Sequence, residues 1–206
     1  MIATDALVPV RSLSTSGWPD RGRKEFVPDQ PAGGIVSYFA AAAVRDAEGW
    51  SASEVSLNDA ADVEDVADHL RDINPGADVS LLFAEFDDLY LVIMRLDQGE
   101  DLRVFGSDTA FSAESRFGAL LLADVAPPVG GVELEAGATA PVERDRSEGI
   151  PEAEPAGDAD LLADLGVSAH KLLQLCATDG LLPSDITAEL CQMIGCGDEV
   201  EELRES

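Results

Sequence analysis

The apolar positions of this 206-residue chain predict three consecutive strands, at 79–86, 89–96 and 102–107. Short polar turns separate the three runs. Residues 89–94 of the middle run are all apolar, whereas a strand with one solvated face alternates apolar and polar residues. We therefore expect both faces of the middle strand to be covered and the strand to lie inside a sheet.

The segments before and after these strands extend the predicted order to β-β-α-β-β-β-α. In chain order they are a strand at 35–45, a strand at 50–55, a helix that Asn58 or Asp59 caps and that stops at 74–76, and a helix at 113–123. Trp50 is predicted to cap the edge of the sheet. This order indicates an α+β domain with a mainly antiparallel sheet.

Composition divides the chain into five predicted parts. They are a disordered N-terminal extension (1–36), the α+β domain (37–126), an acidic disordered linker (127–157), a small three-helix segment (158–197) and an acidic tail (198–206). Three short helices bury too little surface to be very stable alone. We expect the helical segment to dock on the sheet domain or on a partner.

Val36 is a candidate for the true start of the protein. An alternative initiation codon can be read as valine in a conceptual translation that begins too far upstream. Intact-mass analysis of the protein expressed from its native locus tests this hypothesis, because finding Met1 or Ile2 at the N-terminus would exclude it.

The charge of the chain limits its partners. It has 41 acidic against 13 basic residues and a formal net charge of -28. Each phosphate contact needs a cation, so direct binding to nucleic acid is disfavoured. Anionic membranes are disfavoured for the same reason. The excess of acidic residues fits either a composition adapted for solubility or complementarity to a basic partner.

No residue pattern predicts a catalytic site, a metal site or a cofactor. Cys191 and Cys196 would lie about 140° apart on a helix, and no second Cys/His pair completes a four-ligand site. His69 and His170 lie off the apolar stripes of their helices and begin no H-E-x-x-H motif. Phosphate-binding glycine loops and nucleophile elbows are missing from the sequence. We expect a protein that is not an enzyme and that has reduced thiols in the cytoplasm.

Two turn regions supply the candidates for a partner surface. Asp87 and Asp88 lie between two predicted strands, where aspartate is favoured because it hydrogen-bonds nearby backbone. Ser107 and Asp108 follow a strand and precede a helix, where both helix caps and ligand-binding groups occur. We interpret Ser107 and Asp108 first as capping residues and keep all four as partner-surface candidates.

Several short segments carry a resemblance to a known family. They are Ser37-Tyr38-Phe39-Ala40-Ala41, Asp46-Ala47-Glu48-Gly49-Trp50, Asp88-Leu89-Tyr90-Leu91-Val92-Ile93, Arg103-Val104-Phe105-Gly106-Ser107-Asp108, and Leu162-Ala163-Asp164-Leu165-Gly166 through Leu181-Leu182-Pro183. In these segments the chain resembles the tRNA adenosine deaminase-associated proteins of high-GC Gram-positive bacteria. The resemblance implies association with the wobble-adenosine deaminase and implies no activity of the chain's own.

The chain is not itself such a deaminase. These enzymes need H-x-E and P-C-x-x-C motifs to hold zinc and move protons. Here His69 is followed by Leu70-Arg71, and no P-C-x-x-C is present.

Our leading expectation is a non-catalytic acidic accessory protein that binds a basic protein surface, either on a tRNA adenosine deaminase or on another basic protein. Two alternatives remain open. The first is an immunity or antitoxin-like inhibitor of a basic nuclease. The second is an enzyme of unrecognised type with carboxylate chemistry, for which a deep pocket with convergent acids of perturbed pKa would be the first sign.

Overall fold

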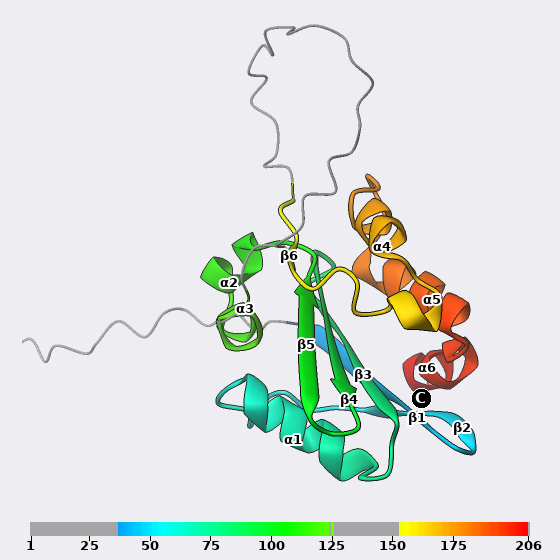
Figure 1. Ribbon diagram of the computed structural model, residues 1–206. Coiled ribbons are helices and arrows are strands. Elements are labelled where there is room, and N and C mark those ends of the chain that lie inside the picture. The colour runs from blue at the N-terminus through cyan, green and yellow to red at the C-terminus, as the bar shows by residue number, and fades with distance from the viewer. Residues whose placement is uncertain (1–36, 124, 126–152, 206) are drawn as a thin grey trace, which may run out of the picture. The chain divides into compact units, whose positions relative to one another are not determined.

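The computed structural model describes residues 37–123, 125 and 153–205. Its strands are β1 (Tyr38–Asp46), β2 (Gly49–Glu54), β3 (Val79–Phe86), β4 (Tyr90–Asp97), β5 (Asp101–Gly106) and β6 (Ala156–Gly157). They form one sheet in the order β2-β1-β3-β4-β5-β6, and every neighbouring pair is antiparallel (Figure 1). The predicted α+β class with a mainly antiparallel sheet is therefore confirmed.

Helices follow the strands in two groups. The first group is α1 (Val63–Ile73), α2 (Ala110–Glu114) and α3 (Arg116–Leu122). The second group is the 3-10 helix η1 (Ala163–Leu165), α4 (Ala169–Cys176), α5 (Pro183–Ile194) and α6 (Gly197–Arg204).

Alternate side chains of the central strands enter two separate cores. Leu81 and Phe83 of β3 pack into one core, and Leu82 and Phe86 pack into the other. Strand β4 is buried along almost its whole length and lies between β3 and β5. The expectation that this apolar strand is covered on both faces and lies inside the sheet is confirmed.

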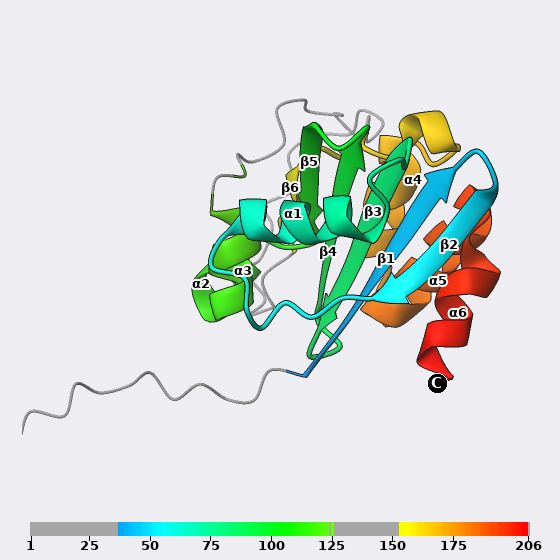
Figure 2. The same ribbon diagram turned by 90° about the horizontal axis from the view of Figure 1, so that it is seen from below.

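Each helix group covers one face of the sheet (Figure 2). Buried residues of α1, α2 and α3 share a core with one face, which we call the α1 face. Buried residues of α4, α5 and α6 share a core with the opposite face, which we call the α6 face. The C-terminal helices therefore dock on the sheet of their own chain, which was one of the two arrangements expected.

Helix α1 begins later than predicted. Its N-cap is Asp62, whose carboxylate accepts hydrogen bonds from the backbone amides of Glu64 at 3.1 Å and Asp65 at 3.0 Å. The prediction of Asn58 or Asp59 as the cap was wrong. Leu57 and Ala60 are buried against the α1 face, which holds the intervening residues as a loop.

The helix predicted at 113–123 is two helices. Ser115 separates them because its backbone is extended, with φ -131° and ψ 142°, and its side chain accepts a hydrogen bond from the amide of Phe117. Gly118 then lies directly against the carbonyl of Phe111. The turn between α2 and α3 thus brings both helices onto the same core.

In the C-terminal part, the start of α4 and both ends of α5 lie where the sequence predicted them. Ser168 caps α4, Pro183 begins α5, and Gly195 ends α5 with φ +94°. The predicted first helix, 159–165, is reduced to η1.

Two short segments outside the three predicted C-terminal helices also form regular structure. Residues 197–204, mostly within the predicted acidic tail, form α6, whose Val200 is buried in the core of the α6 face. Ala156 and Gly157, at the end of the predicted linker, pair with β5 as strand β6. The predicted N-terminal extension, residues 126–152 and Val36 lie outside the described residues.

Gly118 offers a test of the packing between α2 and α3. We expect Gly118→Ala to lower the free energy of unfolding by about 1–3 kcal/mol, because the added methyl would overlap the Phe111 carbonyl. Urea unfolding followed by circular dichroism measures the change. Gly76→Ala is the matched control, because a methyl there meets only Asn74 Oδ1 at 3.5 Å. Equal midpoints for the two variants would contradict the close approach at Gly118.

Candidate interaction surface

Arg95 of β4 is the centre of an ion-pair cluster on the α6 face. Its side chain is only 4% exposed. Its Nε and Nη2 donate to the carboxylate of Asp97 at 2.9 and 2.7 Å, and its Nη1 donates to the carbonyl of Leu161 at 2.7 Å. Both terminal nitrogens also bond to the carboxylate of Asp164. The cluster therefore attaches the segment after β6 to the middle of the sheet.

Arg103 of β5 extends this cluster toward the neighbouring strand. Its Nη2 donates to Asp97 at 2.9 Å, and its Nη1 lies 3.5 Å from Asp158. Its Nε is buried and has no hydrogen-bond partner among the described residues. One carboxylate, that of Asp97, thus bridges two guanidinium groups.

The cluster holds its carboxylates in the ionised form. The hydrogen bond from Arg95 lowers the pKa of Asp164. Burial acts to raise the pKa of Asp97, but hydrogen bonds from Arg95 and Arg103 outweigh it and the pKa is lowered. A general acid needs a raised pKa, so these two carboxylates have the wrong shift for that role.

A polar hollow of about 470 Å³ lies over this cluster. The side chains that line it are Arg45, Asp78, Val79, Arg95, Asp97, Gln98, Glu100, Asp101 and Asp164. Carboxylates outnumber guanidinium groups in this lining, so the hollow is acidic. An apolar hollow of about 320 Å³ lies on the other face, between α1, α3 and β5.

A second ion pair attaches α6 to the sheet. The guanidinium of Arg204 bonds to the carboxylate of Glu85, a β3 residue that is 7% exposed. The same guanidinium lies 4.2 Å from the ring centroid of Phe39. Sequence reasoning missed both pairs. A lone charge inside an apolar strand, as at Glu85 and Arg95, is the signal that could have indicated a buried partner.

The four sequence candidates lie at the opposite end of β4 from Asp97. Asp87 and Asp88 are exposed in the turn between β3 and β4, with φ of +50° and +55°. The Asp87 carboxylate accepts a hydrogen bond from the amide of Ser37 at 2.9 Å. Asp88 thus presents its carboxylate to solvent, while Asp87 also secures the start of β1.

Ser107 and Asp108 have local structural bonds. The hydroxyl of Ser107 is buried and accepts from the amide of Leu91 at 3.0 Å, and Asp108 accepts from the amide of Ala110 at 2.9 Å as α2 begins. The N-cap of α2 is Thr109, which makes no side-chain capping hydrogen bond, so the capping interpretation is not confirmed for Ser107 or Asp108. Asp108 instead bonds the first amide of the helix, and Ser107 joins β5 to β4.

Tyr90 marks the place where these two turns meet. Its hydroxyl donates to the carboxylate of Glu114 at 2.6 Å, and this bond, with burial, raises the pKa of Tyr90 to about 12. The charges of Asp108 and Asp87 add to the rise. The structure therefore brings Asp87 and Asp108 into one acidic region around Tyr90, which we call the hairpin end.

Most basic side chains in the described part of the chain are used internally. In residues 37–123 and 153–205 the sequence has 30 acidic and 7 basic residues. The basic residues in ion pairs are Arg71, Arg95, Arg103, Lys171 and Arg204. Arg45 lies over the ring of Trp50, and Arg116 donates to the carbonyl of Asn58. The surface left for a partner is therefore strongly acidic.

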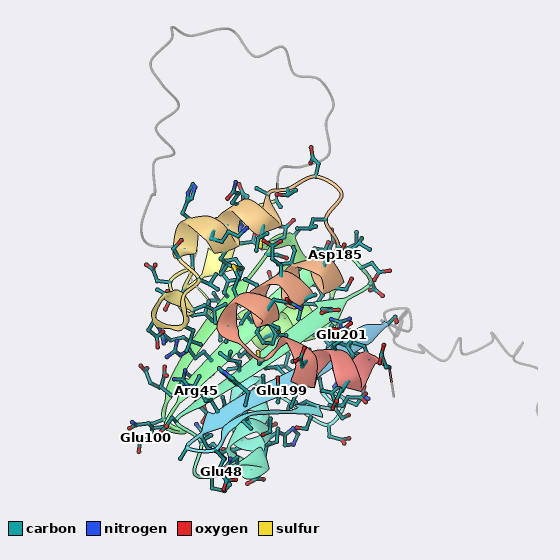
Figure 3. All side chains as sticks on the ribbon, turned by 90° about the vertical axis from the view of Figure 1, so that its right-hand side faces the viewer. Arg45, Glu48, Glu100, Asp185, Glu199 and Glu201 are labelled. Atoms are coloured by element: carbon teal, nitrogen blue, oxygen red, sulfur yellow. The ribbon has the colours of Figure 1, made fainter. Side chains whose placement is uncertain are left out.

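One side of the molecule presents a group of acids from distant parts of the chain. We call it the acidic side, and Figure 3 labels its members Glu48, Glu100, Asp185, Glu199 and Glu201. They come from the β1–β2 turn, the β4–β5 turn, α5 and α6. Acids that are scattered along the sequence therefore gather on the side where α5 and α6 cover the sheet.

The cysteines are free thiols with structural surroundings. Cys191 and Cys196 are buried at the α5–α6 junction, where their mutual hydrogen bond and burial raise the pKa of Cys191. Burial raises the pKa of Cys176 to about 11. Thiols with raised pKa are poor nucleophiles at neutral pH.

The described residues hold neither a metal-binding cluster nor a helix that could cross a membrane. No group of three or more His, Cys, Asp or Glu side chains in 37–123, 125 and 153–205 is arranged to hold a metal ion. None of the helices in these ranges has the length and apolar character needed to cross a bilayer.

Comparison with known protein families shows which family the chain belongs to. The model of the Rv3753c-like tRNA adenosine deaminase-associated protein family matches residues 38–197. The chain belongs to this family. The resemblance noted in the sequence is thereby confirmed, and the family description names association with a tRNA adenosine deaminase. No curated protein and no solved structure matches the chain.

We expect the stability of the protein to depend on pH because of the ion pairs around Arg95. Asp97 and Asp164 have lowered pKa values in the folded protein, so they stabilise it above their ordinary pKa of 3.8, and this contribution is lost as the pH falls through the lowered values. We expect Asp97→Asn/Asp164→Asn to destabilise the protein at pH 7 by about 2 kcal/mol. This is less than the 3–5 kcal/mol of a fully buried pair because solvent reaches Asp164.

Urea unfolding at pH 7 and pH 3 measures this effect. The difference between wild type and the double variant should shrink at pH 3, where the wild-type carboxylates begin to be protonated. Asp72→Asn, an exposed aspartate of α1, is the control and should leave stability nearly unchanged at both pH values. A difference of equal size at both pH values would contradict the assigned ion pairs.

Proposed function

We propose that this chain is a non-catalytic accessory protein that binds a tRNA adenosine deaminase through protein–protein contacts. The family description supports the choice of enzyme. The three free thiols fit a reducing compartment, and we propose that the complex forms in the cytoplasm.

The observation that carries the proposal is the unbalanced acidic surface. Five of the seven basic side chains in the described residues are already bound to acids of the same chain. The remaining carboxylates repel phosphate backbones and attract cationic surfaces. A basic protein surface is therefore the partner chemistry that fits.

An enzyme that acts on tRNA needs cationic side chains where the phosphates lie. An acidic protein is complementary to that same surface. We therefore propose that the chain contacts the tRNA-facing surface of the deaminase and competes with tRNA there. Such a contact would steer association and lose affinity as salt screens it.

Two regions are proposed for the contact. The first is the acidic side, because its acids come from several elements of the chain and lie on one side of the molecule. The second is the hairpin end, where Asp87, Asp88 and Asp108 carry charge close to one another. Ser107 contributes to the second region by holding β5 against β4, since its hydroxyl is buried.

Isothermal titration of the deaminase from the same genome with this chain tests the proposal. We expect binding at about 50 mM salt that weakens roughly tenfold or more at 300 mM, because exposed charges beyond a Debye length are screened. Added tRNA should reduce the apparent affinity. The chain titrated with tRNA alone should show no binding at either salt concentration.

Lysozyme, a small basic protein, serves as the control for general attraction between opposite charges. The proposal requires that the deaminase bind much more tightly than lysozyme at the same ionic strength. Absence of binding to the deaminase, or binding that does not respond to salt, would overturn it.

A further inference from the structure

We propose that the open edge of β2 accepts an extended basic segment of a partner protein as an additional strand. Strand β2 is the first in the sheet order and therefore has a strand on one side only. Figure 2 shows it at the open side of the sheet, with α6 behind it. The inference rests on the proposed function for the identity of the partner, while the edge itself follows from the sheet.

The register shows which backbone groups of β2 face outward. The amide of Val55 donates to the carbonyl of Ala40 at 2.9 Å, continuing the β1–β2 ladder. In an antiparallel ladder alternate residues bond to the same neighbour. Ser51 and Ser53 therefore bond to β1, and the amides and carbonyls of the residues before, between and after them point away. These three residues are Trp50, Ala52 and Glu54.

The outward groups are available for pairing. Within the described residues, Trp50, Ala52 and Glu54 have no hydrogen-bond partner for their amides. Natural edge strands are often protected by proline, lysine or a bulge. Strand β2 contains none of these residues and pairs with β1 at six consecutive positions. A partner strand could therefore form several backbone hydrogen bonds here.

Helix α6 forms a wall beside this edge. Trp50 and Ala52 are partly buried against the core of the α6 face, which also contains Val200 of α6. Arg45 lies 5.4 Å from the ring centroid of Trp50 and helps to hold it. An added strand would place every second side chain on this face, next to Trp50 and α6.

The charges around the edge select a basic segment. Glu48 lies in the turn at one end of β2, and Glu54 is exposed at the other end. Glu199 and Glu201 of α6 lie on the same side of the molecule as Glu48 (Figure 3). Lysine or arginine at alternate positions of an added strand would meet these carboxylates. The same acids oppose pairing of β2 with a second copy of this chain, whose net charge is also -28.

Residue-resolved amide hydrogen exchange on the full chain tests the inference. In the free chain the amides of Ser51 and Ser53 should exchange slowly, and those of Trp50, Ala52 and Glu54 should exchange fast. Saturating deaminase should slow the three fast amides by about tenfold or more, the effect of about 1.4 kcal/mol per amide. A synthetic peptide of alternating lysine and valine should do the same, and a glutamate–valine peptide should not.

A pair of variants at one position separates backbone pairing from side-chain effects. Ala52→Pro removes an outward amide without removing a bond to β1, and Ala52→Thr keeps that amide. We expect the proline variant to bind the deaminase and the basic peptide about tenfold more weakly, and the threonine variant to stay within about threefold of wild type. Circular dichroism and Tm establish that both variants are folded.

A charge-reversal pair keeps the test decisive if the proline variant does not fold. Glu199→Lys/Glu201→Lys should reduce the protection of the outward β2 amides by the lysine–valine peptide about tenfold or more, and Asp59→Lys/Asp72→Lys should change that protection much less. The second double variant alters the net charge by the same amount in and before α1.

The outcomes distinguish this inference from the proposed function. A complex with the deaminase in which the three amides stay fast overturns the edge site and leaves the proposed function standing. If no complex forms, the proposed function fails, and the basic peptide decides the edge site by slowing the three amides or leaving them fast. Protection of these amides in the chain alone, with a dimer mass in light scattering, overturns the inference in favour of self-pairing.

Discussion

A buried cation in the middle of the sheet determines where the C-terminal helices attach. Burying the guanidinium of Arg95 costs several kcal/mol unless hydrogen bonds and opposite charges compensate. Asp97 supplies part of this compensation from the same strand, and Asp164 with the carbonyl of Leu161 supplies the rest. The segment after β6 must therefore return to β4. The packing of α4, α5 and α6 over one face follows from that return, as does the position of α6 near β2.

Local sequence signals predicted the parts of the fold that depend on near neighbours. The limits of β3 agree with its apolar run, and Pro183 and Gly195 mark the ends of α5. The cap of α1 could not be chosen in this way, because several residues before Val63 can cap, and the burial of Leu57 and Ala60 holds the earlier ones in a loop. Tertiary packing decided between locally equivalent choices.

Features that depend on distant pairing were not predictable. Acids around Val200 concealed an amphipathic helix, and the partner of Arg204 is Glu85, 119 residues away. The turn at Asp87 was predicted, but its closeness to Asp108 through Tyr90 requires the strand order. The open edge of β2 also requires that order, so the sequence could indicate only the edge position of Trp50.

The chain uses its few basic residues to hold its own elements together and leaves an acidic surface and an open strand edge at β2. Membership of a deaminase-associated family gives this surface a specific proposed partner. The most direct measurement is size-exclusion chromatography with light scattering of this chain co-expressed with the tRNA adenosine deaminase from the same genome, at low salt. A single species whose mass includes both proteins is the predicted result. Separate elution of the two proteins would contradict a physical association.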